Sequence, residues 1–321
     1  MDRRRRPARL LAGVALAALG GLALAADTRP PLRAMSWIPH DADLVRVFAT
    51  QPTECLTVPT DPAAARSIEI GRAAFRTPVL LGGQAARAGL SCESCHRSGR
   101  GNPDFQFPGA SGAPGTADVT LSLFSSRRGN GVHDPKPIPD LSGPRDRLKV
   151  ASAGLPDFIH GLIVEEFDGH APPPAVLAGL ADYVRALSPA ACPKAAREPT
   201  TPRQLLDDAR RALTAAEAVA HDDRPTAVLM IAAARARLFL IDERYAAQPR
   251  QIARLRAADA DLAALQTQVR DGRPDAARGL ARRRAASADL EAALGAGRGA
   301  SLFDPRALRR ATNRRLPPKT S

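Results

Sequence analysis

Residues 91–96 read Ser-Cys-Glu-Ser-Cys-His, and this stretch decides how the rest of the chain is interpreted. Cys-x-x-Cys-His is the attachment signature of a c-type haem. Because Cys92 and Cys95 are three residues apart, one turn of backbone presents both thiols to one edge of a porphyrin. His96 follows directly and offers its imidazole to the iron as the proximal ligand. The motif therefore predicts one covalently attached haem c.

Two other uses of the same residues compete with haem attachment. Cys92 and Cys95 resemble a dithiol redox pair, and with His96 they resemble half of a zinc site. A zinc site normally needs a second Cys/His pair at ligand spacing, and the chain has none. A thioredoxin-like redox pair would lie in a β-α-β pattern, which the flanking sequence does not show.

The N-terminus has the three-part layout of a secretory signal, which we assign to residues 1–25. Five arginines within residues 2–9 precede an uncharged apolar run, Leu10–Leu24, and Ala23-Leu24-Ala25 offers a small-residue cleavage site. The apolar run is short for a transmembrane helix, which needs about 20 residues. An uncleaved membrane anchor is the alternative interpretation. Because haem is attached to exported thiols, motif and signal agree, and we predict a periplasmic protein.

The two remaining cysteines, Cys55 and Cys192, flank the motif nearly symmetrically. In an oxidising compartment they can form a disulfide that joins the two ends of the haem-binding domain. Two unpaired buried thiols are the alternative. We predict the disulfide.

Helical patterns surround the motif and predict a mainly α fold. Residues 26–60 are an extended lead-in with one short helix near 44–48, and residues 61–199 form a mono-haem cytochrome c-like domain. Asp61-Pro62 begins a helix that runs to Phe75, because an acidic cap and a first-turn proline favour a helix start. Further helices are predicted over 155–166 and 174–187, and the latter should cross the first. The Gly/Pro-rich stretch 98–144 is expected to pack as a loop around one haem face, since apolar side chains recur through it.

The chain after residue 200 is rich in Ala, Arg and Leu and predicts an antiparallel helical bundle over 200–303. Four helical segments are expected at 203–221, 225–245, 249–270 and 274–295, because short joints favour antiparallel neighbours. The second segment should be the most buried, and Leu262, Leu265 and Val269 should form an apolar stripe on the third. Residues 304–321 read as a mobile basic tail.

Several segments together resemble the bacterial di-haem cytochrome c peroxidase and MauG-like family. The resemblance covers about 65–190, and within it only the haem motif is specific. It is carried by Gly71-Arg72 with Phe75, by Leu80–Leu90 and the motif, by Leu155–Gly161 with Glu165-Glu166, and by a closing helix over Leu177–Leu187.

Membership of that family would imply peroxide chemistry with two haems, one reacting with peroxide and the other relaying electrons. This chain departs from the pattern in two respects. It has a single attachment motif, and Ile159 stands where the family often has a methionine ligand. Electron relay between two irons within one chain is therefore lost.

The second axial ligand of the iron decides the function, and His160 is our candidate. It lies in the family-like segment at the start of a predicted helix. His133 and His170 follow the motif in polar, Pro-rich surroundings and are alternatives, as is an open or water-occupied iron. Met230 lies in an apolar helix and is expected to be core.

These observations favour single-electron transfer, because a c-type haem with two protein ligands changes oxidation state with little rearrangement. A peroxidase-like haem enzyme reduced by an external donor is the alternative, for which the distal side of the iron must be open. A haem-based sensor whose helical bundle binds a partner is the third possibility.

The charge distribution bears on partners rather than on the haem. The formal net charge is +13, and residues 200–321 hold 23 Lys/Arg against 14 Asp/Glu. No recognition motif or aromatic interleaving accompanies this charge, so nucleic-acid binding is not predicted. We expect an acidic redox partner protein, or an anionic membrane surface contacted by the basic tail.

Overall fold

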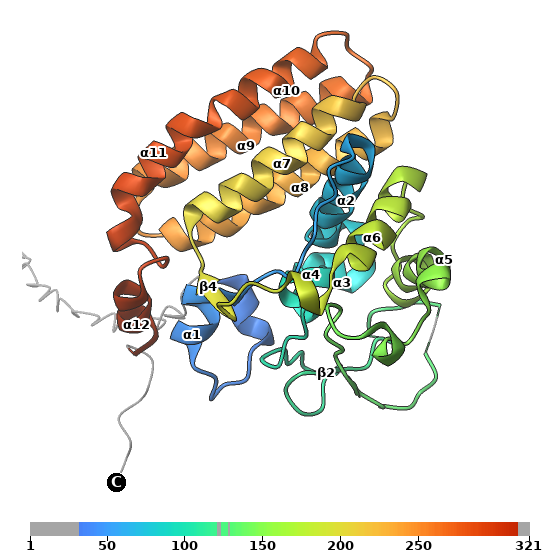
Figure 1. The fold of residues 1–321 in the computed structure, drawn as a ribbon. Coiled ribbons are helices and arrows are strands. Elements are labelled where there is room, and N and C mark those ends of the chain that lie inside the picture. The colour runs from blue at the N-terminus through green and yellow to red at the C-terminus, as the bar shows by residue number, and fades with distance from the viewer. Residues whose placement is uncertain (1–31, 121–122, 128, 314–321) are drawn as a thin grey trace, which may run out of the picture.

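The computed structural model describes residues 32–120, 123–127 and 129–313, and this part of the chain is mainly helical. The predicted signal segment, 1–25, and residues 314–321 lie outside the described residues. Figure 1 shows long helices stacked together above a region of shorter helices and loops that contains the Cys-x-x-Cys-His motif. None of the described helices combines the length and the apolar character needed to cross a bilayer.

Two helices cross in the region that carries the motif, as the sequence predicts. Helix α2 (Pro62–Phe75) begins where the Asp61 carboxylate accepts a hydrogen bond from the Ala64 N–H at 2.8 Å. It packs against α6 (Pro174–Ala186) at Gly71, where an added Cβ would lie 1.8 Å from the Gly179 carbonyl oxygen. Since the two backbones touch at this point, no larger residue fits at Gly71.

The predicted helix over 155–166 is present in two parts. Helix α5 (Leu155–Gly161) is regular, and the wider π-helical turn η6 (Leu162–Glu166) continues it. The short helix expected near 44–48 is α1 (Leu44–Ala49).

The loop between the motif and α5 is packed at its aromatic side chains, as expected, whereas residues 129–134 are exposed. Phe105 and Phe124 are buried, and the strand pair β2 (Thr116–Ala117) and β3 (Lys136–Pro137) holds its middle together. A row of aromatic contacts ties the loop to both flanks: Trp37 stacks on Phe107 at 5.0 Å, Phe107 meets Phe124 at 5.1 Å, and Phe124 meets Phe167 at 5.5 Å. Aromatic burial therefore orders a stretch that has little regular secondary structure.

The second half of the chain forms the predicted bundle, with one difference. Helices α7 (Pro202–Val219), α8 (Arg224–Asp242) and α9 (Pro249–Arg270) match the first three segments. The fourth segment is two helices, α10 (Ala276–Ala285) and α11 (Ser287–Gly297). A single turn residue, Ala286 (φ −66°, ψ −6°), separates them, and the Ser287 hydroxyl donates to the Arg284 carbonyl at 2.6 Å, a local bond that competes with helix continuation.

Burial in the bundle follows the predicted pattern. Helix α8 supplies fully buried Met230, Ile231 and Ile241 and contacts both α7 and α9. The stripe of Leu262, Leu265 and Val269 on α9 is buried as well. Helices α10 and α11 contact α7 and α9, so the four segments close into a ring around one core.

The bundle and the motif region share a single hydrophobic core, because α2 packs on α7 and α8 as well as on α6. The lead-in is also attached to the rest of the chain. Its strand β1 (Thr50–Pro52) pairs antiparallel with β4 (Arg197–Pro199), the segment that leads into the bundle.

The interpretation of a mobile tail is wrong for residues 305–313. They form helix α12 (Pro305–Asn313), which contacts α1 and buries Leu308 completely beside Val47 and Phe48. The Asp304 carboxylate accepts the Ala307 N–H at 2.9 Å and caps the helix. The remaining short elements are η1 (Arg33–Trp37), η2 (Pro78–Leu80), α3 (Gly83–Ala88), α4 (Cys92–Cys95), η3 (Arg97–Gly99), η4 (Arg145–Arg147), η5 (Ser152–Gly154), η7 (Pro189–Ala191), η8 (Glu243–Tyr245) and η9 (Arg298–Ala300).

Candidate haem-attachment site

The motif forms a single helical turn, α4, followed by a sharp reversal of the chain. The Ser91 N–H donates to the Ser94 hydroxyl at 3.0 Å, which fixes the start of the turn. Ser98 and Gly99 then adopt positive φ angles of 56° and 70°. A Cβ at Gly99 would lie 2.6 Å from the Leu187 side chain, so both the conformation and the packing against the end of α6 require glycine there.

Cys92 and Cys95 are not bonded to each other and are partly accessible. Protein nevertheless surrounds both thiols closely, and this burial raises the pKa of each to about 12. A redox-active cysteine pair needs a thiolate, and therefore a lowered pKa. Burial of these thiols thus disfavours the thiolate form on which dithiol exchange depends.

His96 is held by a hydrogen bond from its ring to the loop. Nδ1 lies 3.1 Å from the Pro139 carbonyl oxygen, and since a carbonyl only accepts, Nδ1 carries the proton. Burial lowers the pKa of His96 to about 4, outweighing this hydrogen bond and the charge of Asp140, which both raise it. The imidazole is therefore neutral at pH 7, with the lone pair on Nε2 available to a metal.

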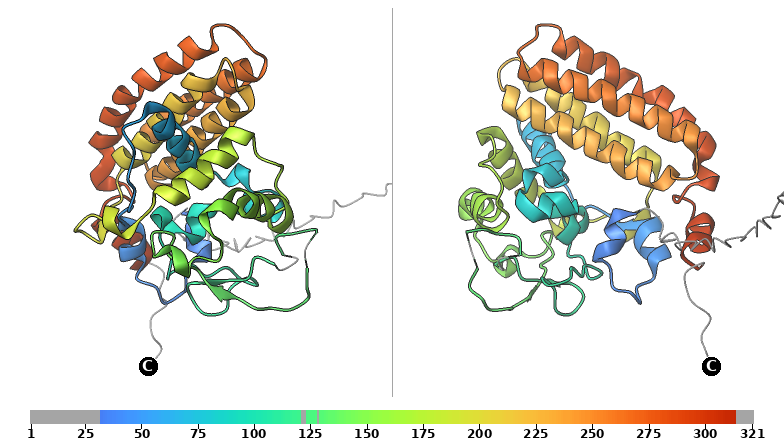
Figure 2. Two further views of the ribbon diagram at one scale, coloured as in Figure 1. Left: turned by 45° about the vertical axis from the view of Figure 1, so that its right-hand side comes forward. Right: turned by 180° about the vertical axis from the view of Figure 1, so that it is seen from behind.

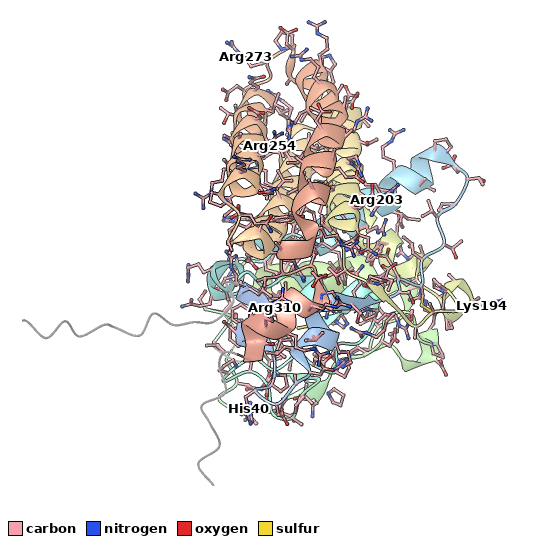
Figure 3. The ribbon with its side chains drawn as sticks, turned by 90° about the vertical axis from the view of Figure 1, so that its left-hand side faces the viewer. His40, Lys194, Arg203, Arg254, Arg273 and Arg310 are labelled. Atoms are coloured by element: carbon pink, nitrogen blue, oxygen red, sulfur yellow. A yellow bond between two sulfur atoms is a disulfide. The ribbon has the colours of Figure 1, made fainter. Side chains whose placement is uncertain are left out.

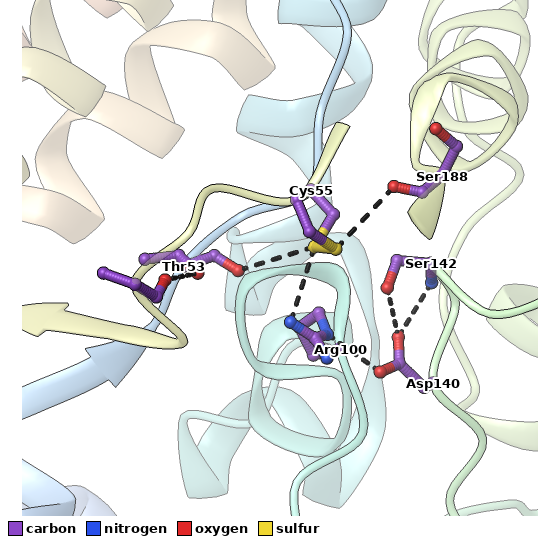
Figure 4. Close-up of a disulfide and its surroundings, with 8 residues drawn as sticks. Thr53, Cys55, Arg100, Asp140, Ser142 and Ser188 are labelled. Carbon is purple, nitrogen blue, oxygen red and sulfur yellow. Dashed lines mark hydrogen bonds and ion pairs between the residues drawn. A yellow bond between two sulfur atoms is a disulfide. The ribbon is translucent and has the colours of Figure 1, made fainter. Parts of the chain in front are cut away.

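A second layer of hydrogen bonds holds the loop segment that carries this carbonyl (Figure 4). Asp140, the residue after Pro139, accepts from Arg100 Nε at 2.8 Å and from the Ser142 hydroxyl at 2.6 Å. Arg100 also points its NH1 at the Cys55 sulfur, 3.4 Å away. The Cys55–Cys192 pair, Arg100 and Asp140 therefore form a continuous support behind the orientation of His96.

Cys55 and Cys192 form the predicted disulfide, with an S–S distance of 2.07 Å across 137 residues of sequence. Cys55 is fully buried. The bond joins the lead-in before α2 to the segment after α6, and thereby closes the motif region at the two ends of its crossed helices.

The donor set fits a haem c on chemical grounds: one helical turn presents two protonated thiols and a neutral, oriented imidazole. His96 would bind the iron, while Cys92 and Cys95 would carry the thioether bonds. The Phe75 ring, 6.4 Å from the His96 ring, belongs to the apolar surroundings. Across the residues that the structure describes, no three His, Cys, Asp or Glu side chains gather where they could hold a bare metal ion.

The opposite face of α4 carries charge, which sequence reasoning missed. Glu93, the residue after Cys92, accepts from Arg76 Nε at 2.8 Å. Arg76 also binds Glu54 at 2.9 Å and Asp208 of α7 at 3.0 Å, so one buried guanidinium joins the lead-in, the motif and the bundle. Since these partners lie up to 132 residues from Arg76, no local pattern signals the network.

Further bonds complete this network. Arg72 binds Glu54, and the Tyr183 hydroxyl donates to Glu54 at 2.6 Å. Burial raises the pKa of the Glu54 carboxyl, but Arg76 and Arg72 together outweigh it and the pKa is lowered. Burial likewise opposes ionisation of Asp208, whose pKa Arg76 and three further arginines hold below its ordinary value. Both carboxylates are therefore charged at neutral pH.

The candidate second ligand, His160, lies in the last turn of α5, not at the start of the helix as predicted, and is half-buried. No hydrogen bond or ring contact links it to His96 in the described part of the chain, so its role as a ligand stays a prediction. The alternatives His133 and His170 are exposed. Met230 is fully buried in the bundle core, as predicted.

Comparisons with protein-family models, with curated proteins and with solved structures find no match to this chain.

Proposed function

We propose that this chain is an exported mono-haem c-type cytochrome that transfers single electrons. The observation that carries the proposal is the state of His96, which is neutral, directed by the Pro139 carbonyl, and located directly after two thiols on one helical turn. A haem attached there supplies one-electron chemistry through its iron.

The chain's own part is to hold and orient. Cys92 and Cys95 would hold the haem through thioether bonds, and the Pro139 carbonyl fixes the tautomer and plane of His96. The Asp140–Arg100 pair and the disulfide limit movement of the loop that carries this carbonyl. Small rearrangement between oxidation states follows from this rigidity, which suits an electron relay better than a group that must open to substrate.

The crossing of α2 and α6 and the packed loop support the cytochrome c-like interpretation of residues 61–199. In this proposal His160 would supply the second protein ligand to the iron. Disulfide pairing of Cys55 and Cys192 supports an oxidising, periplasmic location. Exposed arginines on the bundle and on α12, among them Arg203, Arg254, Arg273 and Arg310, supply the basic surface for an acidic redox partner or an anionic membrane surface (Figure 3).

The test is the absorption spectrum of protein matured in a host competent for cytochrome c biogenesis. We expect pigment that survives acid–acetone extraction, and a six-coordinate low-spin spectrum in both oxidation states that carbon monoxide leaves unchanged. Colourless protein, or pigment lost to extraction, would refute haem attachment. A high-spin ferrous form that binds carbon monoxide and turns over peroxide would replace the relay with the peroxidase-like alternative, and carbon monoxide binding that changes partner affinity would replace it with the sensor.

Matched variants separate the roles of the residues. Replacing Cys92 and Cys95 together by alanine should abolish covalent pigment, whereas the same replacement at Cys55 and Cys192 should leave it attached. His160→Ala should convert the low-spin spectrum to one that responds to carbon monoxide. If His160→Ala leaves the spectrum unchanged, another residue is the second ligand.

A further inference from the structure

A cleft of about 710 Å³ lies behind the motif, on the face of α4 opposite the two cysteines. It is bordered by η1, α1 and the Glu93–Arg97 side of α4 on one wall and by α8 on the other; Figure 2 shows these elements from behind. A volume of this size suits a small organic ligand. The walls are partly apolar, with Phe105, Leu205 and Leu255 among the buried lining residues.

Three arginines line this cleft without a carboxylate partner. Arg97 donates to the Thr50 carbonyl at 3.1 Å, and Arg237 donates to the Arg76 carbonyl. Arg244 donates to the carbonyls of Phe48 and Leu302, at 2.9 and 3.2 Å. None of the three forms a salt bridge within the described ranges of the chain. Backbone oxygens accept from their N–H groups, and the Arg244 guanidinium also lies over the Phe303 ring, 4.6 Å from its centroid.

Two other arginines on the same cleft differ from these three because each is paired with at least one carboxylate. Arg235 binds Asp259 at 2.7 Å, and Arg76 binds three carboxylates. Asp208 and Glu93 are the carboxylates whose charges raise the pKa of Arg237, and both already form salt bridges with Arg76. The cleft therefore holds surplus positive charge.

Surplus buried charge is costly, because a guanidinium loses its water without gaining a counter-ion. Arg237 and Arg244 are 7% and 8% exposed. Burial lowers the pKa of Arg237, and burial together with the nearby charge of Arg97 lowers that of Arg244 to about 10. Arg237 and Arg244 are seven positions apart along α8 and η8, which is about two helical turns. Their Cα atoms therefore lie on one side of the helix, about 10 Å apart along its axis.

A further observation independently points to a ligand. Thr200 is 4% exposed and lines the cleft, yet its hydroxyl has no hydrogen-bond partner. A hydroxyl can donate to an anion that the arginines attract. Asp242 Oδ1, also on the lining, lacks a donor, and a hydroxyl on the same ligand would supply one.

Two large apolar side chains of the lining are exposed, and the Arg33 guanidinium lies over the ring of one of them, Phe239, 4.3 Å from its centroid. Val79 and Phe239 are 62% and 44% exposed, unusually accessible for large hydrophobic side chains, and both line the cleft. An occupant with an apolar body would cover them and gain from their burial.

We propose that this cleft binds a small organic anion, with a carboxylate or phosphate group at Arg97, Arg237 and Arg244 and an apolar body toward Val79 and Phe239. Guanidinium groups suit both kinds of anion because each can be bound through two parallel hydrogen bonds. The site is separate from the cysteine face of α4, and it stands whether or not the haem proposal does.

The test is calorimetric titration of the full exported chain with four ten-carbon probes below their micelle-forming concentrations. Decanoate and decyl phosphate carry the two candidate anions, while decanol and decyltrimethylammonium carry the same tail without negative charge. We expect at least one anion to bind and the cation not to bind, and the stronger anion identifies the head group. Equal binding of all four, or of none, would overturn the proposal.

Variants locate the binding. Arg237→Gln should weaken the anion about tenfold or more, because one charged hydrogen bond is lost. Arg254→Gln, on the exposed outer side of α9, should leave the affinity unchanged. Thr200→Val and Phe239→Glu keep all three guanidiniums, so they test the same cleft should Arg237→Gln fail to fold. Each should weaken the anion; unaltered affinity in both would place the binding elsewhere.

Discussion

The two faces of α4 differ in almost every physical respect. The face with Cys92, Cys95 and His96 is neutral, and its groups are held by one carbonyl and the loop behind it. The face with Glu93 and Arg97 is charged and reaches into a network that includes residues of the bundle. A four-residue turn thus separates the candidate haem-attachment residues, which are neutral, from a region where charge is paired or in surplus.

Helix α2 is what allows both faces to exist side by side. Phe75 lies beside His96 on the neutral side, while Arg76, the next residue, is the centre of the charged side. Because α2 also packs on α6, α7 and α8, it transmits any displacement to both faces at once. The position of the motif therefore depends on the packing of α2.

The largest effect is expected from Gly71→Val, which would remove both faces together. An added Cβ would meet the Gly179 carbonyl, and the crossing backbones cannot both stay in place. We expect a loss of about 5 kcal/mol or more, seen as failure to accumulate folded protein in a protease-resistance assay. Gly295→Ala on α11, where a Cβ meets nothing within 4 Å, is the control and should be neutral or slightly stabilising. A folded Gly71→Val protein would show that the crossing is not needed.

Arg76→Met should remove the ion pairs of the charged face and leave the cysteine face of α4 unchanged. This change leaves Glu54, Glu93 and Asp208 without their shared counter-ion, and breaking a buried ion pair in this way costs about 3–5 kcal/mol. Urea unfolding monitored by circular dichroism measures the loss. Arg203→Gln, at an exposed helix start, should change the free energy of unfolding by less than about 0.5 kcal/mol. Equal losses in the two variants would mean that the network contributes little.

The neutral face is tested by removing the disulfide. Replacing Cys55 and Cys192 together by alanine should cost about 2–4 kcal/mol, because the unfolded chain gains the freedom of a 137-residue separation. The midpoint of thermal unfolding of the double variant, compared with that of the unmodified protein, measures the change. A thermal midpoint that does not fall would show that the crossed helices alone close the region.

The smallest effect is a change in acid sensitivity at the charged face. Because the folded pKa of Glu54 lies below its ordinary value of 4.5, the unfolded state binds the proton more readily. The stability that this carboxylate contributes is therefore present above about pH 4.5 and lost as the pH falls through the lower folded pKa. Urea midpoints measured from pH 6 downward should fall less steeply in Glu54→Gln than in the unmodified protein. Parallel curves would contradict this assignment.

Local rules explain how much the sequence predicted. Helix starts at Asp61, Thr201 and Asp223 depend on residues three positions away, and the structure confirms the helices that follow them. The pairing of Cys55 with Cys192 could be predicted because the motif assigns the other two cysteines, Cys92 and Cys95, to haem attachment. The break at Ala286 and the helix over 305–313 were missed, because a serine side chain decided the first and packing against α1 stabilised the second.

By itself, the sequence determined the spacing of two thiols and an imidazole, the mainly helical class and the order of the helices, since these depend on contacts within about four residues. Only the tertiary structure decided which carbonyl directs His96, which carboxylates reach Arg76, and which arginines stay without one. Those partners come from distant segments that meet around α2 and α8. Coulombic and hydrogen-bond energies depend on distance in space, which no sequence spacing records.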